Sequence, residues 1–317
     1  MKLEFWLSML ILVALIFTAT LTFTRIRTTE QSVSTEDLNV SVTNSLYDAA
    51  LKNKWNFDNE AERDSFVTDF IEELMEHKDE VYSEAGEQNF QEKIPAIALT
   101  ATDGFYLCFL DTYTEVGGFT YFKKNYSLKQ PYSAQIIAGG GKCILMMSYD
   151  GTVEVLTPDD MTIKGTREDV FNKMGRPIEL DFLADEQEYY DYISARAVEQ
   201  IVKAFENTLK EHSYGNDVNM DYSLSLPLGE TSTHRAITNQ TVFALYQDKI
   251  DKNGEVWTDI YSICAAELVK GAKYGIIKSG NDFVYYNTKD GLRSGTIFIG
   301  SDDACAAFGA VPESYYN

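Results

Sequence analysis

The sequence predicts an α+β protein, in which an N-terminal transmembrane helix is followed by a mostly antiparallel sheet packed with long helices. Three observations carry this prediction. Residues 5–24 contain no charge and no proline, residues 94–110 and 142–156 each read as two strands around an Asp-Gly turn, and residues 183–212 carry apolar side chains at helical spacing. A helix of twenty residues spans about 30 Å, the thickness of the hydrocarbon core of a bilayer.

The apolar segment predicts an anchor that stays on the protein rather than a cleaved signal peptide. It is longer than a signal-peptide core, and Arg25 and Arg27 follow it in place of a small-residue cleavage site. Basic residues lie on both sides, Lys2 before the segment and the two arginines after it, so they barely decide the orientation. The few residues before the apolar segment and the single large domain after it favour an orientation with the N-terminus inside and the C-terminal domain outside the cytoplasm. We therefore expect a single-pass protein of the cell membrane that contacts lipid through residues 5–24.

The chain is strongly acidic, with 49 Asp and Glu residues against 27 Lys and Arg and a formal net charge of −22. Such a surface repels phosphate groups, so we expect no nucleic-acid partner. A hydrophobic content of 44% and an aromatic content of 13% argue for a packed domain rather than a disordered chain.

The four cysteines, Cys108, Cys143, Cys264 and Cys305, are far apart and lack the spacing of a zinc site. Cys108 and Cys143 lie in apolar, strand-like runs and are expected as buried thiols. An even number of cysteines permits two disulfides outside the membrane, and the sequence leaves all three pairings open.

The segment that follows the anchor is expected to continue as a helix. Its apolar residues Val42, Leu46 and Ala50 recur near three- and four-residue spacing and mark one face. This stripe needs a cover, because a short polar helix is marginal on its own in water. We expect these three residues to contact a protein partner or the chain's own sheet.

The rest of the chain alternates helix and strand patterns. A second helix is expected at residues 59–78, and residues 112–135 are expected to form a long loop or an irregular edge between the hairpins. Further strand-like stretches lie at residues 222–228, 241–246, 256–263, 273–278 and 283–286. The predicted domains are an anchor at 1–27, a helical stalk at 28–80, an α+β domain with both hairpins and the long helix at 81–215, and a β-rich segment with short helices at 216–317.

No motif in the sequence indicates a reaction. His77, His212 and His234 each stand among polar neighbours and are expected at the surface. Residues 139–142 are glycine-rich but lack the spacing of a phosphate-binding loop, and neither a nucleophile elbow nor a zinc-protease motif occurs. We therefore expect no catalytic residue, no metal site and no cofactor, and we interpret the chain as a protein that is not an enzyme.

A short head, one apolar span and a helix leading to residues 42–50 (VTNSLYDAA) resemble the N-terminal part of pseudopilins of tight-adherence (Tad) and type IV pilus-like systems. This resemblance implies insertion with the C-terminus outside and an anchor helix that extends into an outer globular domain. It also implies a role as a minor subunit or assembly factor at the cell surface, with protein partners in an envelope assembly.

The C-terminal stretch that begins at Tyr285 resembles the zinc-binding module of Ada-type DNA-repair proteins. Asn287 stands at the position of the histidine ligand, Asp290 near that of the first cysteine, and Glu313 and Tyr316 at those of the last two cysteines. Because all the soft ligands are replaced, the resemblance implies a shape rather than a metal site. That shape is a hairpin, a short helix at residues 301–308 and a tight C-terminal turn.

Three functions are consistent with these observations. The first is an anchored extracytoplasmic structural or interaction protein, as a pseudopilin-like or assembly component of a bacterial surface apparatus. The second is an extracytoplasmic ligand-binding or sensory domain that uses the sheet of the hairpins as a pocket wall, although a sensor needs an output and the sequence carries no second apolar span. The third is an anchored hydrolase, which would need two acids that converge in a pocket.

Overall fold

The structure is a computed structural model, and it describes residues 40–52, 55–77, 93–114, 120–138, 140–212, 241–252, 255–267, 274–279, 282–307 and 309–315. The predicted anchor at residues 5–24, the predicted strand at 222–228 and the expected domain boundaries near residues 80 and 215 lie outside this part of the chain. Among the described residues, no helix has the length and apolar character needed to span a membrane.

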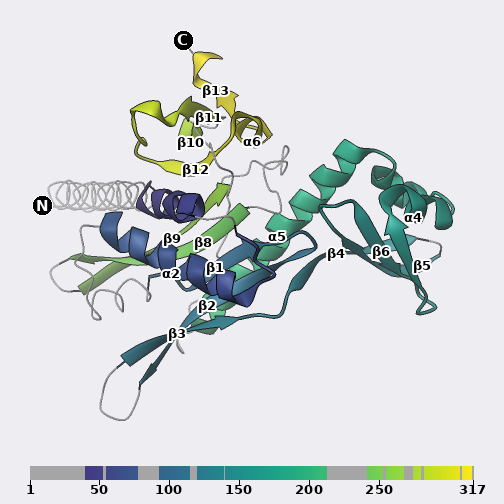
Figure 1. Cartoon of the computed structure of the whole chain (residues 1–317), viewed down its shortest axis with the longest axis horizontal. Helices are drawn as coiled ribbons and strands as arrows, with labels where there is room; N and C mark the ends of the chain where they lie inside the picture. The colour runs from purple at the N-terminus through teal and green to yellow at the C-terminus, as the bar shows by residue number, and fades with distance from the viewer. Residues whose placement is uncertain are drawn as a thin grey trace, which may run out of the picture.

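Thirteen strands of the described chain form one large sheet, and helices cover it, so the fold is α+β (Figure 1). The strands are β1 (Ala96–Thr100), β2 (Gly104–Thr114), β3 (Thr120–Tyr126), β4 (Gln130–Ala138), β5 (Gly141–Met147), β6 (Thr152–Leu156), β7 (Thr162–Thr166), β8 (Thr241–Lys252), β9 (Glu255–Glu267), β10 (Tyr274–Ser279), β11 (Asp282–Asn287), β12 (Thr296–Gly300) and β13 (Val311–Pro312). Their order is β13-β11-β10-β12-β9-β8-β1-β2-β4-β5-β6-β7, and β3 pairs with β2 beside this path. The pairs β9–β12 and β11–β13 are parallel and the other pairs are antiparallel, as the sequence predicted for most of the sheet.

Both predicted hairpins are confirmed. In the first, β1 and β2 pair up to Thr100 opposite Phe105, and the amide of Ala101 donates to the carbonyl of Gly104 at 2.7 Å. In the second, β5 and β6 flank a turn in which Gly151 has a φ of 80°, a conformation that glycine adopts without strain. The Asp-Gly pairs in the sequence therefore placed both turns correctly.

The expectation of a loop or irregular edge at residues 112–135 is wrong. The strand β2 continues to Thr114, and β3 and most of β4 lie within this stretch. Figure 1 shows β2 and β3 extending together away from the rest of the sheet. Polar and aromatic side chains are compatible with strands that are covered on only one side, because the backbone hydrogen bonds to the neighbouring strand hold them in place.

Helices pack on both faces of the central strands. In β1, the side chains of Ala96 and Ala98 belong to one core cluster, whereas those of Ile97 and Leu99 belong to the other. Successive side chains of a strand point to opposite faces. Because both faces of β1 are covered, all five of its residues are buried. The first cluster lies under helix α5 (Glu186–His212), and the second lies under α2 (Glu60–His77) and the helical residues 40–52.

The long helix α5 confirms the strongest helical pattern of the sequence. Six inward side chains recur every four residues and are at most 3% exposed: Tyr189, Ile193, Ala197, Ile201, Phe205 and Leu209. The helix starts at Glu186 rather than at Leu183, because the carboxylate of Asp185 accepts from the amides of Gln187 at 2.8 Å and Glu188 at 3.0 Å and so caps its first turn. Residues Ile178–Leu183 form a separate 3-10 helix.

The first two described helices form a layer of the domain. The predicted helix at 59–78 is confirmed as α2, which Asn59 caps by accepting from the amide of Ala61 at 3.0 Å. Its inner side chains share a core cluster with residues of β1, β8 and β9. Residues 40–52 join the same cluster, so within the predicted stalk of residues 28–80 these two helices pack directly on the sheet.

The C-terminal segment contains the strands and the short helix expected from the sequence. The strands β10 and β11, at the stretches expected at 273–278 and 283–286, form a hairpin, and the helix α6 (Asp302–Ala307) lies at the helix expected at 301–308. A short 3-10 turn at Glu313–Tyr315 follows. The strand β12 joins this segment to the large sheet by pairing with β9, with Phe298 opposite Ala265.

All four cysteines are buried thiols outside any disulfide. The sequence predicted this state for Cys108 and Cys143 and left it open for the other two. Cys108 and Cys264 lie in one row of the sheet, with residues of β1 and β8 between them. Because neighbouring strands are about 4.8 Å apart, three strand spacings separate these two thiols by more than a disulfide can bridge.

Candidate functional site

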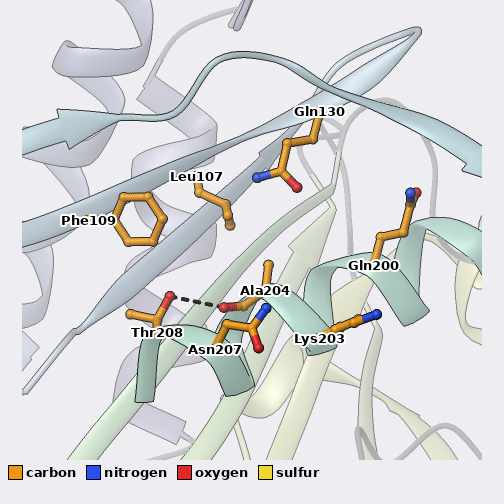
Figure 2. Close-up of a pocket in the computed structure, with 8 residues that line it drawn as sticks. All are labelled: Leu107, Phe109, Gln130, Gln200, Lys203, Ala204, Asn207 and Thr208. Atoms are coloured by element: carbon orange, nitrogen blue, oxygen red, sulfur yellow. Dashed lines mark hydrogen bonds between the residues drawn. The ribbon is translucent and has the colours of Figure 1, made fainter. Parts of the chain in front are cut away.

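A pocket of about 400 Å³ lies between α5 and the strands β2 and β4 (Figure 2). Eight residues line it: Leu107 and Phe109 of β2, Gln130 of β4, and Gln200, Lys203, Ala204, Asn207 and Thr208 of α5. The volume falls within the range of sites for small molecules. The pocket is therefore large enough for a ligand of modest size.

The helix α5 forms one wall of the pocket, and the strands β2 and β4 form the other. The inward stripe of α5 packs on the sheet, and this places the next positions around the helix, residues 200, 203, 204, 207 and 208, along the mouth. The side chain of Gln200 fixes the gap, because its amide nitrogen donates to the Ser133 hydroxyl at 3.1 Å and to the Pro131 carbonyl at 3.4 Å. Leu107, which is 2% exposed, forms an apolar floor.

The polar groups of the pocket are amides and one ammonium. Figure 2 shows Gln130 reaching from the strands toward α5, while Asn207 and Lys203 extend from the helix. Among the eight lining residues, Lys203 is the only one with a charge. The whole chain has a net charge of −22, but the residues that line the pocket carry one positive charge. The pocket therefore suits a polar or weakly acidic ligand.

The hydrogen-bonding groups of the pocket are two kinds of amide, a hydroxyl and an ammonium. The hydroxyl, on Thr208, donates to the carbonyl of Ala204 at 3.0 Å within the helix, and no carboxylate, imidazole or thiol lies among the eight lining residues.

The buried tyrosines near the pocket have structural roles. The hydroxyl of Tyr189 donates to the carbonyl of Ser148 at 2.7 Å and accepts from its amide at 3.1 Å, and that of Tyr132 donates to the carbonyl of Ala101 at 3.1 Å. Burial raises the pKa of both phenols well above the ordinary value, so they stay protonated at neutral pH. These phenols tie turns and strand ends to the core.

The three residues that the sequence singled out as contacts, Val42, Leu46 and Ala50, lie on one helix and are 0%, 0% and 6% exposed. The chain itself covers them, because they belong to the core cluster that α2 and the sheet complete. The hydroxyl of Thr43 also approaches the carbonyl of Thr296 in β12 at 3.4 Å. Figure 1 shows this helix, in purple, between α2 and β12. The sequence left open whether a protein partner or the chain's own sheet contacts this stripe, and in the structure the chain's own core does so.

The end of this helix carries an exposed apolar side chain. Leu51 follows directly after the buried stripe and is 44% exposed.

The sequence analysis did not single out the residues of the pocket. Gln200, Lys203 and Asn207 are three or four residues apart beside the apolar stripe of α5, and this spacing is visible in the sequence. The wall formed by the strands could not be found from spacing, because Gln130 lies in the stretch that the sequence assigned to a loop.

Comparisons with protein-family models, with curated proteins and with solved structures found no match to this chain.

Proposed function

We propose that this chain is a single-pass membrane protein whose domain lies outside the cytoplasm and acts as a structural or assembly component of a bacterial surface apparatus, in the manner of a pseudopilin. One observation carries the proposal. The helix that follows the predicted anchor, residues 40–52, is an integral part of the domain core rather than a tether.

This arrangement keeps the domain close to the membrane. The 15 residues 25–39 separate the predicted span from the buried helix, and 15 residues reach at most about 50 Å when fully extended. A domain fixed at this distance suits a protein that works within an assembly at the membrane surface. The acidic surface supports the same role, because it is repelled by anionic lipid and stays available to protein partners.

The location can be tested with one introduced cysteine. Leu128, in the connection between β3 and β4, is 90% exposed, whereas the four native cysteines are buried. A membrane-impermeant maleimide should label Leu128→Cys in intact cells and should leave the native chain unlabelled. Labelling of Leu128→Cys only after lysis would place the domain in the cytoplasm and would refute the proposal.

The assembly role can be tested with a matched pair on the helix of residues 40–52. The full-length chain, extracted in mild detergent, should migrate in a complex larger than a monomer. Leu51→Asp should release it from the complex without lowering its melting temperature, because the side chain is exposed. Leu51→Asn, which changes polarity without adding charge, should have a smaller effect. A monomeric native chain, or a complex that Leu51→Asp leaves intact, would remove the support for the assembly role.

The pocket favours a second function, the binding of a small polar ligand by an extracytoplasmic domain. Its amides and single ammonium suit amino acids or monosaccharides. Screening the full-length chain in detergent against these two classes should then give a ligand that raises the melting temperature, and Asn207→Ala should reduce that rise. If no member of either class shifts the melting temperature at millimolar concentration, this second function loses its support.

A further inference from the structure

Two helices of the domain bring together three side chains that can bind a metal. Asp48 lies in the helix of residues 40–52, and Glu73 and His77 lie in α2. One ligand atom from each lies within 4.8 Å of the other two, and His77 Nε2 is 2.8 Å from Asp48 Oδ2. Asp48 and Glu73 are partly buried, with side-chain exposed fractions of 39% and 17%, and His77 is an exposed residue.

The positions of these residues follow from the packing of the two helices. Glu73 and His77 are four residues apart on α2 and therefore project from the same side of it. Leu74 and Ala49, next to the ligands in the sequence, are fully buried in the core that the two helices share. The apolar contacts thus hold the carboxylate of Asp48 opposite the other two groups before any ion arrives, which is what a preorganised site requires.

We propose that Asp48, Glu73 and His77 form a site for a divalent transition-metal ion of the zinc type. One imidazole nitrogen and two carboxylate oxygens are a ligand set that zinc accepts, with a water molecule as the fourth ligand. Ligand atoms around one zinc ion lie about 3.5 Å from one another, so side-chain rotation would widen the 2.8 Å contact between His77 and Asp48 and shorten any wider pair. The imidazole favours zinc, cobalt or nickel over magnesium and calcium, which prefer oxygen ligands.

The charge around the three residues is compatible with a bound cation. Lys52 Nζ lies 3.0 Å from Glu73 Oε1 and 3.7 Å from Asp69 Oδ1, and the carboxylate of Glu72 also acts on it. With a neutral imidazole, the carboxylates of Asp48, Asp69, Glu72 and Glu73 outnumber the one ammonium, and a divalent ion would reduce this excess of negative charge. Lys52 keeps Asp69 as a partner when the metal takes an oxygen of Glu73.

The metal would connect two segments that are distant in the sequence. It would replace the hydrogen bond between His77 and Asp48 by two coordinate bonds, and so fasten residues 40–52 to the last turn of α2. Binding to the folded state alone stabilises that state in proportion to the logarithm of the metal concentration. The ion would therefore strengthen the attachment of the first described helix to the rest of the domain.

The sequence analysis expected no metal site, because the neighbours of His77 along the chain supply no obvious ligand cluster. Within α2, the spacing of Glu73 and His77 was visible as a pair four residues apart. The third ligand is contributed by another helix, and only the packing of the two helices identifies it.

The test uses the full-length chain in detergent, freed of metal with a chelator that is then removed. Zinc chloride at a hundredfold excess over its dissociation constant should raise the melting temperature by roughly 5 °C. Calorimetric titration should give one zinc ion per chain, and magnesium chloride should have no comparable effect. Cobalt chloride should give a visible absorption spectrum of nitrogen and oxygen ligation, without the charge-transfer band of a thiolate.

Three variants assign the site. His77→Ala and Asp48→Asn should each weaken zinc binding by more than about tenfold. His212→Ala, which also changes a histidine at the end of a helix, should leave it unchanged. Lys52→Ala should tighten binding, because it removes the competitor for Glu73, and a merely destabilising change would not do so.

Several outcomes would overturn the proposal. The first is a native chain that binds no zinc at micromolar concentrations. The second is a stoichiometric site that survives both His77→Ala and Asp48→Asn, and the third is a cobalt spectrum with a thiolate band. Melting curves without metal show that each variant is folded, and His77→Gln replaces His77→Ala if that variant is not.

Discussion

Truncation of Leu46 to alanine tests whether the helix of residues 40–52 belongs to the core. The side chain is fully buried and packs in the cluster that α2 and the sheet complete. Replacing a buried leucine by alanine removes its contacts and leaves a cavity, with a loss of about 3 kcal/mol in the free energy of unfolding. For a domain of this size, that corresponds to a melting temperature lower by roughly 6 to 10 °C.

The assay is urea unfolding of the full-length chain in detergent, followed by tryptophan fluorescence. Trp55 is a suitable probe because its ring lies 5.2 Å from that of Phe66 on α2, beside the helix under test. The matched control is Leu51→Ala on the same helix, which is 44% exposed and should change the stability by less than about 0.5 kcal/mol. Equal midpoints for the two variants would refute the placement of this helix in the core.

Three further changes test the junctions of the fold. Gly104→Ala should destabilise the chain by about 2–3 kcal/mol, because its methyl carbon would lie 2.3 Å from a backbone oxygen of β4. Tyr189→Phe should cost about 1–3 kcal/mol, because it removes the hydroxyl that accepts from the amide of Ser148 and donates to its carbonyl, although the amide of Gly151 still donates to that carbonyl. Burial acts to raise the pKa of Asp58, but hydrogen bonds from Lys129 and Tyr106 outweigh it and lower that pKa. A lowered pKa contributes stability that is present above about pH 4 and is lost as the pH falls further, so Asp58→Asn should flatten the decline in stability between pH 5 and pH 2.

Each of these changes has a control in the chain. Gly165→Ala places its methyl carbon 3.2 Å from a side-chain atom rather than against backbone, so it should be milder than Gly104→Ala. Tyr190→Phe, beside Tyr189 on α5, should have the smaller effect of the two. Asp159→Asn, in an exposed turn, also removes one carboxylate and so controls for the change in net charge. Urea midpoints measure all of them, and a control that matches its test variant would contradict the corresponding argument.

The elements that the sequence predicted well are those that local patterns determine. The Asp-Gly turns located both hairpins, and the recurring apolar residues of α5 located that helix to within three residues at its start. The strands β3 and β4 were missed because their stability comes from pairing with β2 and β5, which no local pattern records. Single-residue alternation in β4, with Tyr132 and Ala134 inward, was present in the sequence but was obscured by the polar residues around it.

The candidate sites were harder to predict than the fold, because each combines segments that are far apart. The pocket needs a strand assigned to a loop, and the proposed metal site needs the packing of two helices. The apolar stripe of Val42, Leu46 and Ala50 shows the same limit. Its spacing indicated that something covers it, but only the sheet order, with β8 beside β1, shows that strands from the distant half of the chain complete the cover that α2 and β1 begin.

The contact between Thr43 and Thr296 has a consequence for synthesis of the chain. These residues are 253 positions apart, and the strands β8, β9 and β12 that complete the core around the first helix are translated last. At about 5–20 residues per second, the apolar side of that helix is uncovered for roughly 10–50 s after it leaves the ribosome. During this time the predicted anchor is already able to enter the membrane, whereas the domain cannot close. The nascent chain therefore needs protection for its N-terminal helices until the C-terminal strands arrive, and truncations before β8 should be degraded rather than accumulate as folded fragments.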